Sequence, residues 1–597
     1  MRAAARATRT LRDQLLGRPR RSAGELRPDR RAYGRQVTES DDEQRTAVVR
    51  ILGLGGSHHD FCACLIEDGR VVSAIEEERL TRKKIAFGLG PRLQRCLSAD
   101  YVLSEAGVGI DDVDLVVAND FVNPVFTLRF RDRVDWIGHH LSHAASTFYT
   151  SPFERAAVLV MDGRGSTVAR NGELYGETIS FYTAGPDGLQ VVRGLHGRVT
   201  LTDRRSEDPY EDSVGWMYEA VSKAIGFLTS GGMGAPGKTM GLAPYGTPRY
   251  VQALGEFYVL RDGEFRQSTS QQIALRTLIE RELARAGTPA ARDEVRADFA
   301  YAVQEHTERI VIALVRWLHE KTGARDLCLA GGVALNSVAN YKLLEQTPFE
   351  RIHVVPAAGD QGTALGAALH GYYGLAGNSW KPAPEPFSPY LGRTYGAAEI
   401  DAAIEAEQDR LQTVRPDDLH GHVAKELASG AIVGWFQGRS EIGPRALGNR
   451  SILADPRAAE MKDRINAKVK HREAFRPFAP VVLHERQEEF FTTAVPTPYM
   501  LMVPDVREDR RDVIPAVTHV DGSARMQTAL PELNPGLCEL LRAFDRITGV
   551  PVLLNTSFND NEEPIVETPQ DAVRCFLKTE LDLLVLGDVV LRKGPKA

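Results

Sequence analysis

Apolar runs that end in glycines and acids recur along the chain and predict an α/β fold. Residues 47–56, AVVRILGLGG, form an apolar, β-rich run. Residues 62–78, CACLIEDGRVVSAIEEE, hold two such runs around Asp68-Gly69, which is typical of a β-hairpin turn. Further buried strands are expected at AAVLVM before Asp162 and at LCLA before Gly331, each leading into a polar, glycine-rich loop.

The pattern also predicts a division of the chain. Residues 352–369, IHVVPAAGDQGTALGAAL, read as strand, loop and small-residue helix. A proline-rich stretch then places a boundary near 376–395, and a new α/β pattern begins with LASGAIVGWFQG. We expect a flexible tail over 1–46, a first domain over 47–385 and a second over 390–597.

Composition narrows the class of protein. The 597 residues are 43% hydrophobic and 26% charged, with a net charge of −7 and a pI of about 6.2. These values are typical of a soluble globular protein and disfavour one that coats nucleic acid. The six cysteines contain no CxxC pair, and no apolar run is long enough for a membrane span. A cytoplasmic protein fits best. The first 46 residues hold twelve arginines and seven acids, and resemble a tail more than a targeting segment.

Three histidines lie within five positions in GHHLSHAA. On a helix, His139 and His143 stand one turn apart on one face, and His140 points elsewhere. Two imidazoles on one face can grip a divalent cation, whereas the alternative is a polar surface turn. Asp162 and Asp360 each follow a predicted strand, where open α/β sheets place ligands. The four side chains suggest a site for Fe(II), Mn(II) or Zn(II), although each aspartate alone could be a helix cap.

Glycine-rich loops are candidates for nucleotide binding. Residues 231–246, GGMGAPGKTMGLAPYG, place Lys238 in what reads as a flexible turn. LAGGVALN places Gly331 and Gly332 between a strand and a helix that contains Asn336. Glycines let backbone N–H groups approach a phosphate, and lysine adds charge. Neither loop is a Walker motif, so each signal is weak by itself.

A cation-rich stretch begins the second domain. Residues 437–476 hold ten Lys or Arg against five acids, and several of the bases adjoin apolar or proline-containing sequence. A desolvated cation requires an anionic partner, and a small phosphate meets that need through guanidinium contacts. Internal salt bridges or an RNA groove are the alternatives. His59-Asp60, where the first strand gives way to a loop, is a candidate general base or an ordinary turn histidine.

Taken together, the motifs resemble one family. HDFCACLIEDG, EEERLTRKK, HHLSHAAS, VMDGRGS, PGKTMGLAPYG, AGGVALN, GRSEIGPRALGNRS, VKHREAFRPFAP and VLLNTSFNDNEEPIV occur in this order over about residues 48–597. This series resembles the O-carbamoyltransferases related to the nodulation-factor and tobramycin (nebramycin) carbamoyltransferases.

The resemblance implies a two-lobed domain of the actin-like, sugar-kinase-like ATPase superfamily, followed by an α/β domain similar to threonylcarbamoyl-adenylate synthase. It implies that carbamoyl phosphate and ATP, with Mg(II) as an expected companion, give carbamoyl-adenylate, and that the carbamoyl group then passes to a hydroxyl. The implied Fe(II) ligands are His139, His143, Asp162 and Asp360, with another divalent metal as the alternative, and the implied base is His59. The implied contacts to nucleotide and donor are Lys84, Lys238, Gly332, Asn336, Arg445, Lys470, His471, Arg476, Arg525, Asn555 and Ser557.

The sequence departs from the family pattern at several points. His58 precedes the implied base, so either neighbour could serve, and His471 stands where an acid is expected. Residues 250–300 match no quoted motif, so the acceptor stays open. A small hydroxylated natural product, as in antibiotic biosynthesis, is the expected partner, with neither nucleic acid nor membrane, and a homodimer is allowed. The rival functions are a tRNA-modifying carbamoyl-type transferase, a non-catalytic nucleotide-binding scaffold and a sugar kinase.

Overall fold

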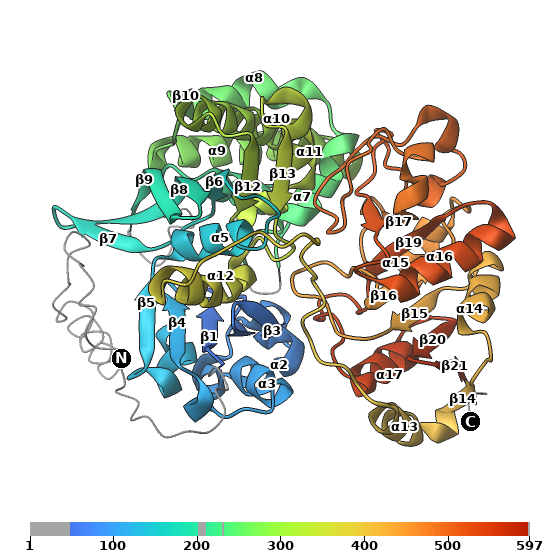
Figure 1. The fold of residues 1–597 in the computed structure, drawn as a ribbon. Coiled ribbons are helices and arrows are strands. Elements are labelled where there is room, and N and C mark those ends of the chain that lie inside the picture. Colours follow the sequence, from blue (N-terminus) through green and yellow to red (C-terminus); the bar gives the residue numbers. More distant parts are fainter. Residues whose placement is uncertain (1–47, 201–209, 230–231, 595–597) are drawn as a thin grey trace, which may run out of the picture. The chain divides into compact units, whose positions relative to one another are not determined.

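The computed structural model describes residues 48–200, 210–229 and 232–594 (Figure 1). The predicted tail over 1–46 lies outside these residues. From Val48 onward the described chain forms one compact unit, in which three large β-sheets and a small hairpin are covered by helices. The predicted α/β class is confirmed. No helix in the described ranges is long and apolar enough to cross a membrane.

The first sheet contains the predicted hairpin. Asp68 and Gly69 have φ of 47° and 79°, the two positive values that a type I′ turn requires. Strand β1 pairs antiparallel with β2 and parallel with β4. The order is β3-β2-β1-β4-β5. The strands are β1 (Arg50–Gly55), β2 (Cys62–Glu67), β3 (Arg70–Glu76), β4 (Leu115–Asn119) and β5 (Val134–Ile137).

The second sheet repeats this topology. Antiparallel strands β9, β8 and β6 take the places of β3, β2 and β1, and β12 and β13 extend the sheet in parallel. Two sheets of one topology agree with the predicted two-lobed domain. The strands are β6 (Ala156–Met161), β7 (Thr167–Arg170), β8 (Glu173–Gly185), β9 (Gly188–Val199), β12 (Asp326–Ala330) and β13 (Arg351–Val354).

Two helices, α5 (His139–Phe148) and α12 (Thr363–His370), lie between these sheets (Figure 1). Helix α12 packs on β1 and β2, α5 packs on β6 and β12, and the helices touch each other. A Cβ atom at Gly366 would lie 1.7 Å from the carbonyl oxygen of Ser142. The small-residue sequence TALGAAL therefore permits a close approach, which brings the start of α5 near the loop before α12.

Further helices cover the two sheets. Helix α10 begins after the Thr288 cap with Pro289 in its first turn, and ends at Gly323, whose φ is 62°. It packs against α6, α8 and α11. The elements are α2 (Glu77–Thr81), α3 (Leu97–Glu105), α4 (Pro124–Thr127), α6 (Val214–Ala224), α7 (Pro236–Leu242), α8 (Val251–Leu254), β10 (Val259–Arg261), β11 (Glu264–Arg266), α9 (Thr269–Arg285), α10 (Pro289–Thr322) and α11 (Ser337–Gln346).

The C-terminal part has its own sheet, which follows residues 376–396, a stretch without helix or strand. Helices α14 and α16 pack together, as do α13 and α17. Strand order is β14-β21-β20-β15-β16-β19-β17-β18. The elements are α13 (Ala397–Glu405), β14 (Leu411–Val414), α14 (Leu419–Ala428), β15 (Val433–Phe436), β16 (Arg450–Ala454), α15 (Met461–Lys468), β17 (Ala479–Leu483), β18 (Gln527–Ala529), α16 (Pro535–Thr548), β19 (Val552–Ser557), α17 (Pro569–Lys578), β20 (Leu583–Leu586) and β21 (Val589–Lys593).

Candidate functional site

Four side chains converge between the two N-terminal sheets. His139 and His143 occupy successive turns at the start of α5, as the spacing predicted. Asp162 directly follows β6, and Asp360 begins the 3-10 turn η9 (Asp360–Gly362) after β13. Both histidines are fully buried and Asp162 is nearly so. One ligand atom from each residue lies within 4.8 Å of the others.

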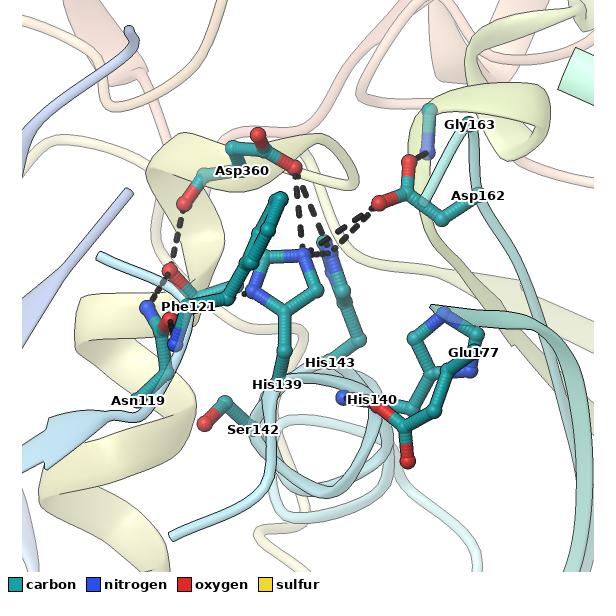
Figure 2. Close-up of polar contacts among 12 residues, drawn as sticks. Asn119, Phe121, His139, His140, Ser142, His143, Asp162, Gly163, Glu177 and Asp360 are labelled. Atoms are coloured by element: carbon teal, nitrogen blue, oxygen red, sulfur yellow. Dashed lines mark hydrogen bonds and ion pairs between the residues drawn. The ribbon is translucent and has the colours of Figure 1, made fainter. Parts of the chain in front are cut away.

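Figure 2 shows the two imidazoles facing both carboxylates. Nε2 of His139 lies 3.2 Å from Nε2 of His143, 3.2 Å from Asp162 Oδ2 and 3.5 Å from Asp360 Oδ1. Nε2 of His143 lies 3.5 Å from Asp360 Oδ1 and 3.9 Å from Asp162 Oδ2. Ligand atoms about 2.1 Å from one ion lie about 3.0–3.4 Å apart in octahedral or tetrahedral geometry. Two of these five separations lie in that range, and the two of 3.5 Å lie just above it.

Charges around the cluster favour a cation at its centre. Burial alone lowers the pKa of His139, but the hydrogen bonds and charges of Asp162 and Asp360 outweigh it and raise the pKa to about 10. Burial alone raises the pKa of Asp360, yet the two imidazoles hold it well below its ordinary value. The carboxylates are therefore ionised. Two imidazoles and two carboxylates fit a divalent ion such as Fe(II), Mn(II) or Zn(II).

His140 lies on another side of α5, as the sequence indicated (Figure 2). Its Nδ1 is 2.8 Å from Ser180 Oγ, and its backbone N–H donates to Glu177. Burial lowers the pKa of His140 to about 4. His140 is a neutral histidine of the protein core and does not belong to the pair His139 and His143.

Asn119, at the end of β4, orients His139. Its Oδ1 lies 3.2 Å from His139 Nδ1, and its amide donates to Thr363 Oγ1 and to the Gly56 carbonyl. An acceptor at Nδ1 places the ring proton there and leaves the Nε2 lone pair for the cluster. Through these hydrogen bonds, Asn119 links the end of β1 and the start of α12 to His139.

Replacing Asn119 by alanine should lower metal affinity. We expect Fe(II) or Mn(II) to bind about 10–100-fold more weakly to Asn119→Ala, because His139 loses the partner that fixes its tautomer. Titration of chelator-treated protein with each metal measures this. Asn340→Ala is the control, since Asn340 is also buried and donates to the Ala334 and Leu501 carbonyls away from the cluster. Equal metal affinity in both variants would contradict the orienting role.

A cavity of about 770 Å³ opens beside the four ligands. We call it the metal cavity. It is lined by Asp162 and Asp360 and by much of the predicted first-domain site, namely His59, Lys84, Gly332 and Asn336. The backbone N–H of Gly332 donates to Asp162 Oδ1 at 3.0 Å. The Asn336 side chain caps α11 and bonds Gln304, so it is already engaged within the protein.

His58 and His59 differ in their surroundings. Nδ1 of His59 is 2.9 Å from Asp60 Oδ2. Burial opposes the charged form, but Asp60 and the more distant acids raise the pKa of His59 to about 9. His58 instead packs edge-on against Phe121, and burial followed by the charge of Arg164 lowers its pKa. Only His59 therefore has the carboxylate that orients an imidazole base.

A second cavity of about 450 Å³ lies at the predicted cation-rich stretch. We call it the arginine cavity. Nε of Arg445 and Nε of Arg525 are buried without a hydrogen-bond partner among the described residues. Burial and then the charge of Arg476 lower the pKa of Arg445 to about 10. Burial and three neighbouring arginines lower the pKa of Arg525. Partly buried guanidinium groups that repel each other are stabilised when an anion pairs with them.

The other predicted residues of this site differ in position. Lys470, Arg476, Asn555 and Ser557 line the arginine cavity. Lys470 Nζ donates to Asn559 Oδ1 at 2.7 Å and to Ser557 Oγ at 3.2 Å. His471 is half exposed and lies outside the lining, where it pairs with Asp560 at 2.9 Å.

Lys238 lines the arginine cavity and pairs with Glu473 at 2.7 Å. It stands on helix α7, so the predicted flexible turn is wrong at this position. Pro236 occupies the first helical position, where its missing N–H costs nothing, and starts the helix. Gly231, the first residue of the predicted loop, lies outside the described residues.

The two cavities adjoin. Their shared wall contains Lys84 and Arg445, together with Thr229, Gly234, Pro236, Gly237, Met240 and Pro444. The backbone of Gly443 is gripped from the N-terminal part of the chain: its N–H donates to Glu76 at 2.6 Å and its carbonyl accepts from Arg79 at 2.8 Å. The loop that carries Arg445 is thus fixed against the metal cavity.

Only half of the ten cations in residues 437–476 face the arginine cavity, namely Arg445, Lys462, Lys470, Arg472 and Arg476. The others are structural. Arg450 stacks 3.6 Å from the centre of the Phe436 ring, and Arg457 pairs with Asp455 at 2.6 Å. The stretch therefore contains both bases that line a cavity and bases that are held by the protein's own groups.

Sequence reasoning missed several residues of the site. Asn119 follows the apolar run LVVA as Asp162 follows AAVLVM, so the same strand-end pattern could have identified it. Arg164 lies within the quoted motif VMDGRGS, but its position on the wall of the metal cavity depends on tertiary packing. His519 lines the arginine cavity, and burial lowers its pKa to about 4. No sequence motif marks it.

Comparison with known proteins identifies the family. Residues 50–128 and 124–369 match the model described as carbamoyltransferase N-terminus, and residues 424–593 match the one described as carbamoyltransferase C-terminus. The chain belongs to the carbamoyltransferase family. The predicted resemblance is confirmed, and the chain is an enzyme of this family.

Two relatives extend over nearly the whole carbamoyltransferase. Nodulation protein NolNO of Sinorhizobium fredii is 40% identical over 575 residues, which cover 90% of this chain and 79% of that protein. An uncharacterised protein of Synechocystis is 37% identical over 630 residues, which cover 92% and 97%. A crystal structure of full-length HypF in a phosphate- and nucleotide-bound form covers 56% of each chain at 16% identity, with a TM-score of 0.38. A TM-score this low carries no conclusion about ligands.

Proposed function

We propose that this carbamoyltransferase makes carbamoyl-adenylate from carbamoyl phosphate and ATP in the arginine cavity, and transfers the carbamoyl group to an acceptor hydroxyl in the metal cavity. The observation that carries the proposal is that Arg445 and Arg525 have buried Nε atoms without partners among the described residues, and that Arg445 stands on the wall shared with the metal cavity. Each cavity suits one half of such a reaction.

The first half-reaction needs a site for highly charged phosphates. Arg445, Arg472, Arg476 and Arg525 line one cavity, and burial followed by neighbouring guanidinium charges lowers the pKa of Arg445, Arg472 and Arg525. Bound phosphates relieve this repulsion and accept bidentate hydrogen bonds. Water cleaves carbamoyl phosphate to carbamate and phosphate. A carbamate oxygen then attacks the α-phosphorus of ATP, and pyrophosphate leaves.

The second half-reaction needs a base beside a phosphate-binding group. Asp60 holds Nδ1 of His59, so in the neutral imidazole Nε2 is the nitrogen left to accept the acceptor's proton. Because the pKa of His59 is raised to about 9, transfer should become faster as the pH rises toward that value. The acceptor oxygen attacks the carbamoyl carbon, and AMP leaves. A divalent metal ion held by His139, His143, Asp162 and Asp360 would neutralise phosphate charge as a Lewis acid, and Fe(II) is the metal that we propose. The backbone N–H of Gly332 donates to Asp162 and so lies beside the same metal site.

Gly443 provides a test of the contact between the cavities. Its φ is 99°, and a Cβ there would lie 2.6 Å from the carbonyl oxygen of Pro356. We expect Gly443→Ala to displace the loop of Arg445 and to raise the KM for carbamoyl phosphate about tenfold, with a loss of about 1–3 kcal/mol in unfolding free energy. Steady-state kinetics and thermal unfolding measure both effects.

Gly430→Ala is the matched control for this substitution. Gly430 has a φ of 92°, but its nearest new neighbour would be the Arg464 side chain at 3.9 Å. This variant should lose similar stability and keep the KM. An equal rise in KM in both variants would show that general destabilisation is responsible.

The reaction products distinguish the proposal from its rivals. With ATP and labelled carbamoyl phosphate, we expect AMP and pyrophosphate, and pyrophosphate release should require carbamoyl phosphate. ADP as the nucleotide product would indicate a kinase, and pyrophosphate release without carbamoyl phosphate would refute the donor assignment. Absence of turnover in the presence of tight ATP binding would indicate a scaffold.

We propose a small hydroxylated molecule, such as a natural product, as the acceptor. The metal cavity of about 770 Å³ is of the size that holds small ligands. Screening hydroxylated metabolites for label from carbamoyl phosphate identifies it. Label found in tRNA, with salt-sensitive tRNA binding, would favour the tRNA-modifying alternative instead.

A further inference from the structure

Arg164 is a half-buried cation of the metal cavity that the proposed reaction does not use. It stands two residues after Asp162, in the loop after β6. Its Nε is buried and has no hydrogen-bond partner, and none of its nitrogens pairs with a carboxylate of the described residues. The side chain lines the metal cavity together with His58, His59 and Asp360.

The guanidinium group of Arg164 is held rigidly. Its Cζ lies 4.5 Å from the centre of the Phe121 ring and 4.6 Å from that of Tyr210. Nη1 donates to the Tyr210 hydroxyl at 2.5 Å. The stem packs on Gly176, where a Cβ would lie 2.6 Å from Arg164 Cγ. A group clamped between two rings loses little further entropy when it binds a ligand.

Each carboxylate around the metal cavity has a basic partner, whereas Arg164 has no acidic partner among the described residues. Asp60 pairs with His59, and Asp162 and Asp360 face the two buried histidines. Glu76 pairs with Arg79, Glu78 with Lys84 and Glu219 with Lys223, at 3.4, 3.5 and 2.9 Å. Each acid on the described wall therefore has a basic neighbour. A polycationic ligand would find no unpaired carboxylate there.

Lys223 is a cation of the same cavity that does have a carboxylate partner. Its Nζ also lies over an aromatic ring, 4.6 Å from the centre of Trp216, but it has Glu219 as a partner. Arg164 has the ring contacts without the carboxylate. An unpaired buried charge is costly, and a guanidinium group pairs best with a planar or tetrahedral oxyanion.

We infer that Arg164 forms an oxyanion-binding subsite in the metal cavity, separate from the arginine cavity. The oxyanion is a phosphate or carboxylate, contributed either by the nucleotide or by the acceptor. If it belongs to the acceptor, acceptors of this enzyme carry an acidic group and are not polyamines. Only the choice between these two sources rests on the proposed function.

Calorimetric binding to the full-length, metal-loaded protein tests the subsite. One arm compares AMP with adenosine, and the other compares glucuronate with glucose. The variants are Arg164→Met, Arg164→Gln in case the methionine variant fails to fold, and the matched control Lys223→Met. We expect loss of Arg164 to weaken one anion about tenfold or more relative to its neutral counterpart, while Lys223→Met changes it less than about twofold.

The outcomes separate the two sources. Weaker binding of AMP alone assigns the subsite to a nucleotide phosphate, and weaker binding of glucuronate alone assigns it to the acceptor. Unchanged binding of both anions, failure of both to bind the wild-type protein, or an equal loss in Lys223→Met would overturn the inference. These are binding measurements, so their failure is distinguishable from a failure of carbamoyl transfer.

Discussion

Arg445→Met is expected to lower the rate of carbamoyl-adenylate formation about 10²–10³-fold, the usual loss when one preorganised donor to a developing charge is removed. Arg445 is half-buried, has a buried Nε without a hydrogen-bond partner among the described residues and stands on the wall between the cavities. Methionine keeps an apolar stem of similar length and removes the charge. Pyrophosphate release dependent on carbamoyl phosphate measures the effect.

The same variant should still transfer the carbamoyl group from supplied carbamoyl-adenylate. Arg457→Met is the control, because Arg457 belongs to the same stretch but pairs with Asp455. It should keep full pyrophosphate release. If Arg445→Met released pyrophosphate as fast as Arg457→Met, the arginine cavity would not be the donor site.

His59→Gln is expected to slow carbamoyl transfer about 10²–10⁴-fold and to leave carbamoyl-adenylate formation intact. The reason is the contact of His59 Nδ1 with Asp60, which leaves Nε2 to accept a proton. Labelled carbamoyl phosphate and the acceptor found by screening allow both half-reactions to be followed. Carbamoyl-adenylate should accumulate in the variant.

His58→Gln is the matched control, since His58 is the adjacent histidine and lines the same cavity without an acidic partner. It should retain most of the transfer activity. A larger loss in His58→Gln than in His59→Gln would make His58 the base. Loss of both half-reactions in His59→Gln would refute a role limited to transfer.

Local patterns predicted the elements that carry the site. The period of GHHLSHAA placed His139 and His143 on one face, and the structure has them on successive turns of α5. The Asp68-Gly69 hairpin and the strands before Asp162 and Gly331 also follow from short-range alternation and turn chemistry. These features depend on neighbours in sequence, so a single chain reveals them.

Long-range contacts were beyond such reasoning. Spacing alone could not place Asp360 beside His139, because packing of distant segments brings them together; the position of Asp360 after a predicted strand suggested the grouping, and the family resemblance implied it as well. Lys238 was misread because glycines around it suggested a turn, whereas Pro236 starts a helix. Arg164 is held in the cavity wall by contacts with Phe121 and Tyr210, which come from other parts of the chain.

The count of basic residues located a cavity lined by cations, but it also included bases that do not line this cavity. The stretch 437–476 does supply the arginine cavity, but Arg439 donates to the backbone carbonyls of Leu391 and Gly392, and Arg450 to those of Gln437 and Gly438. A guanidinium group that binds carbonyls and one that awaits an anion look alike in sequence. Only burial and hydrogen-bond partners separate them.

The most direct test of the central claim is a crystal structure of the full-length protein soaked with carbamoyl phosphate and a non-hydrolysable ATP analogue. We predict phosphate density against the guanidinium groups of Arg445 and Arg525, and an anomalous metal peak among His139, His143, Asp162 and Asp360. An arginine cavity without a bound anion, whose guanidinium groups are turned onto the protein's own acids, would contradict the account.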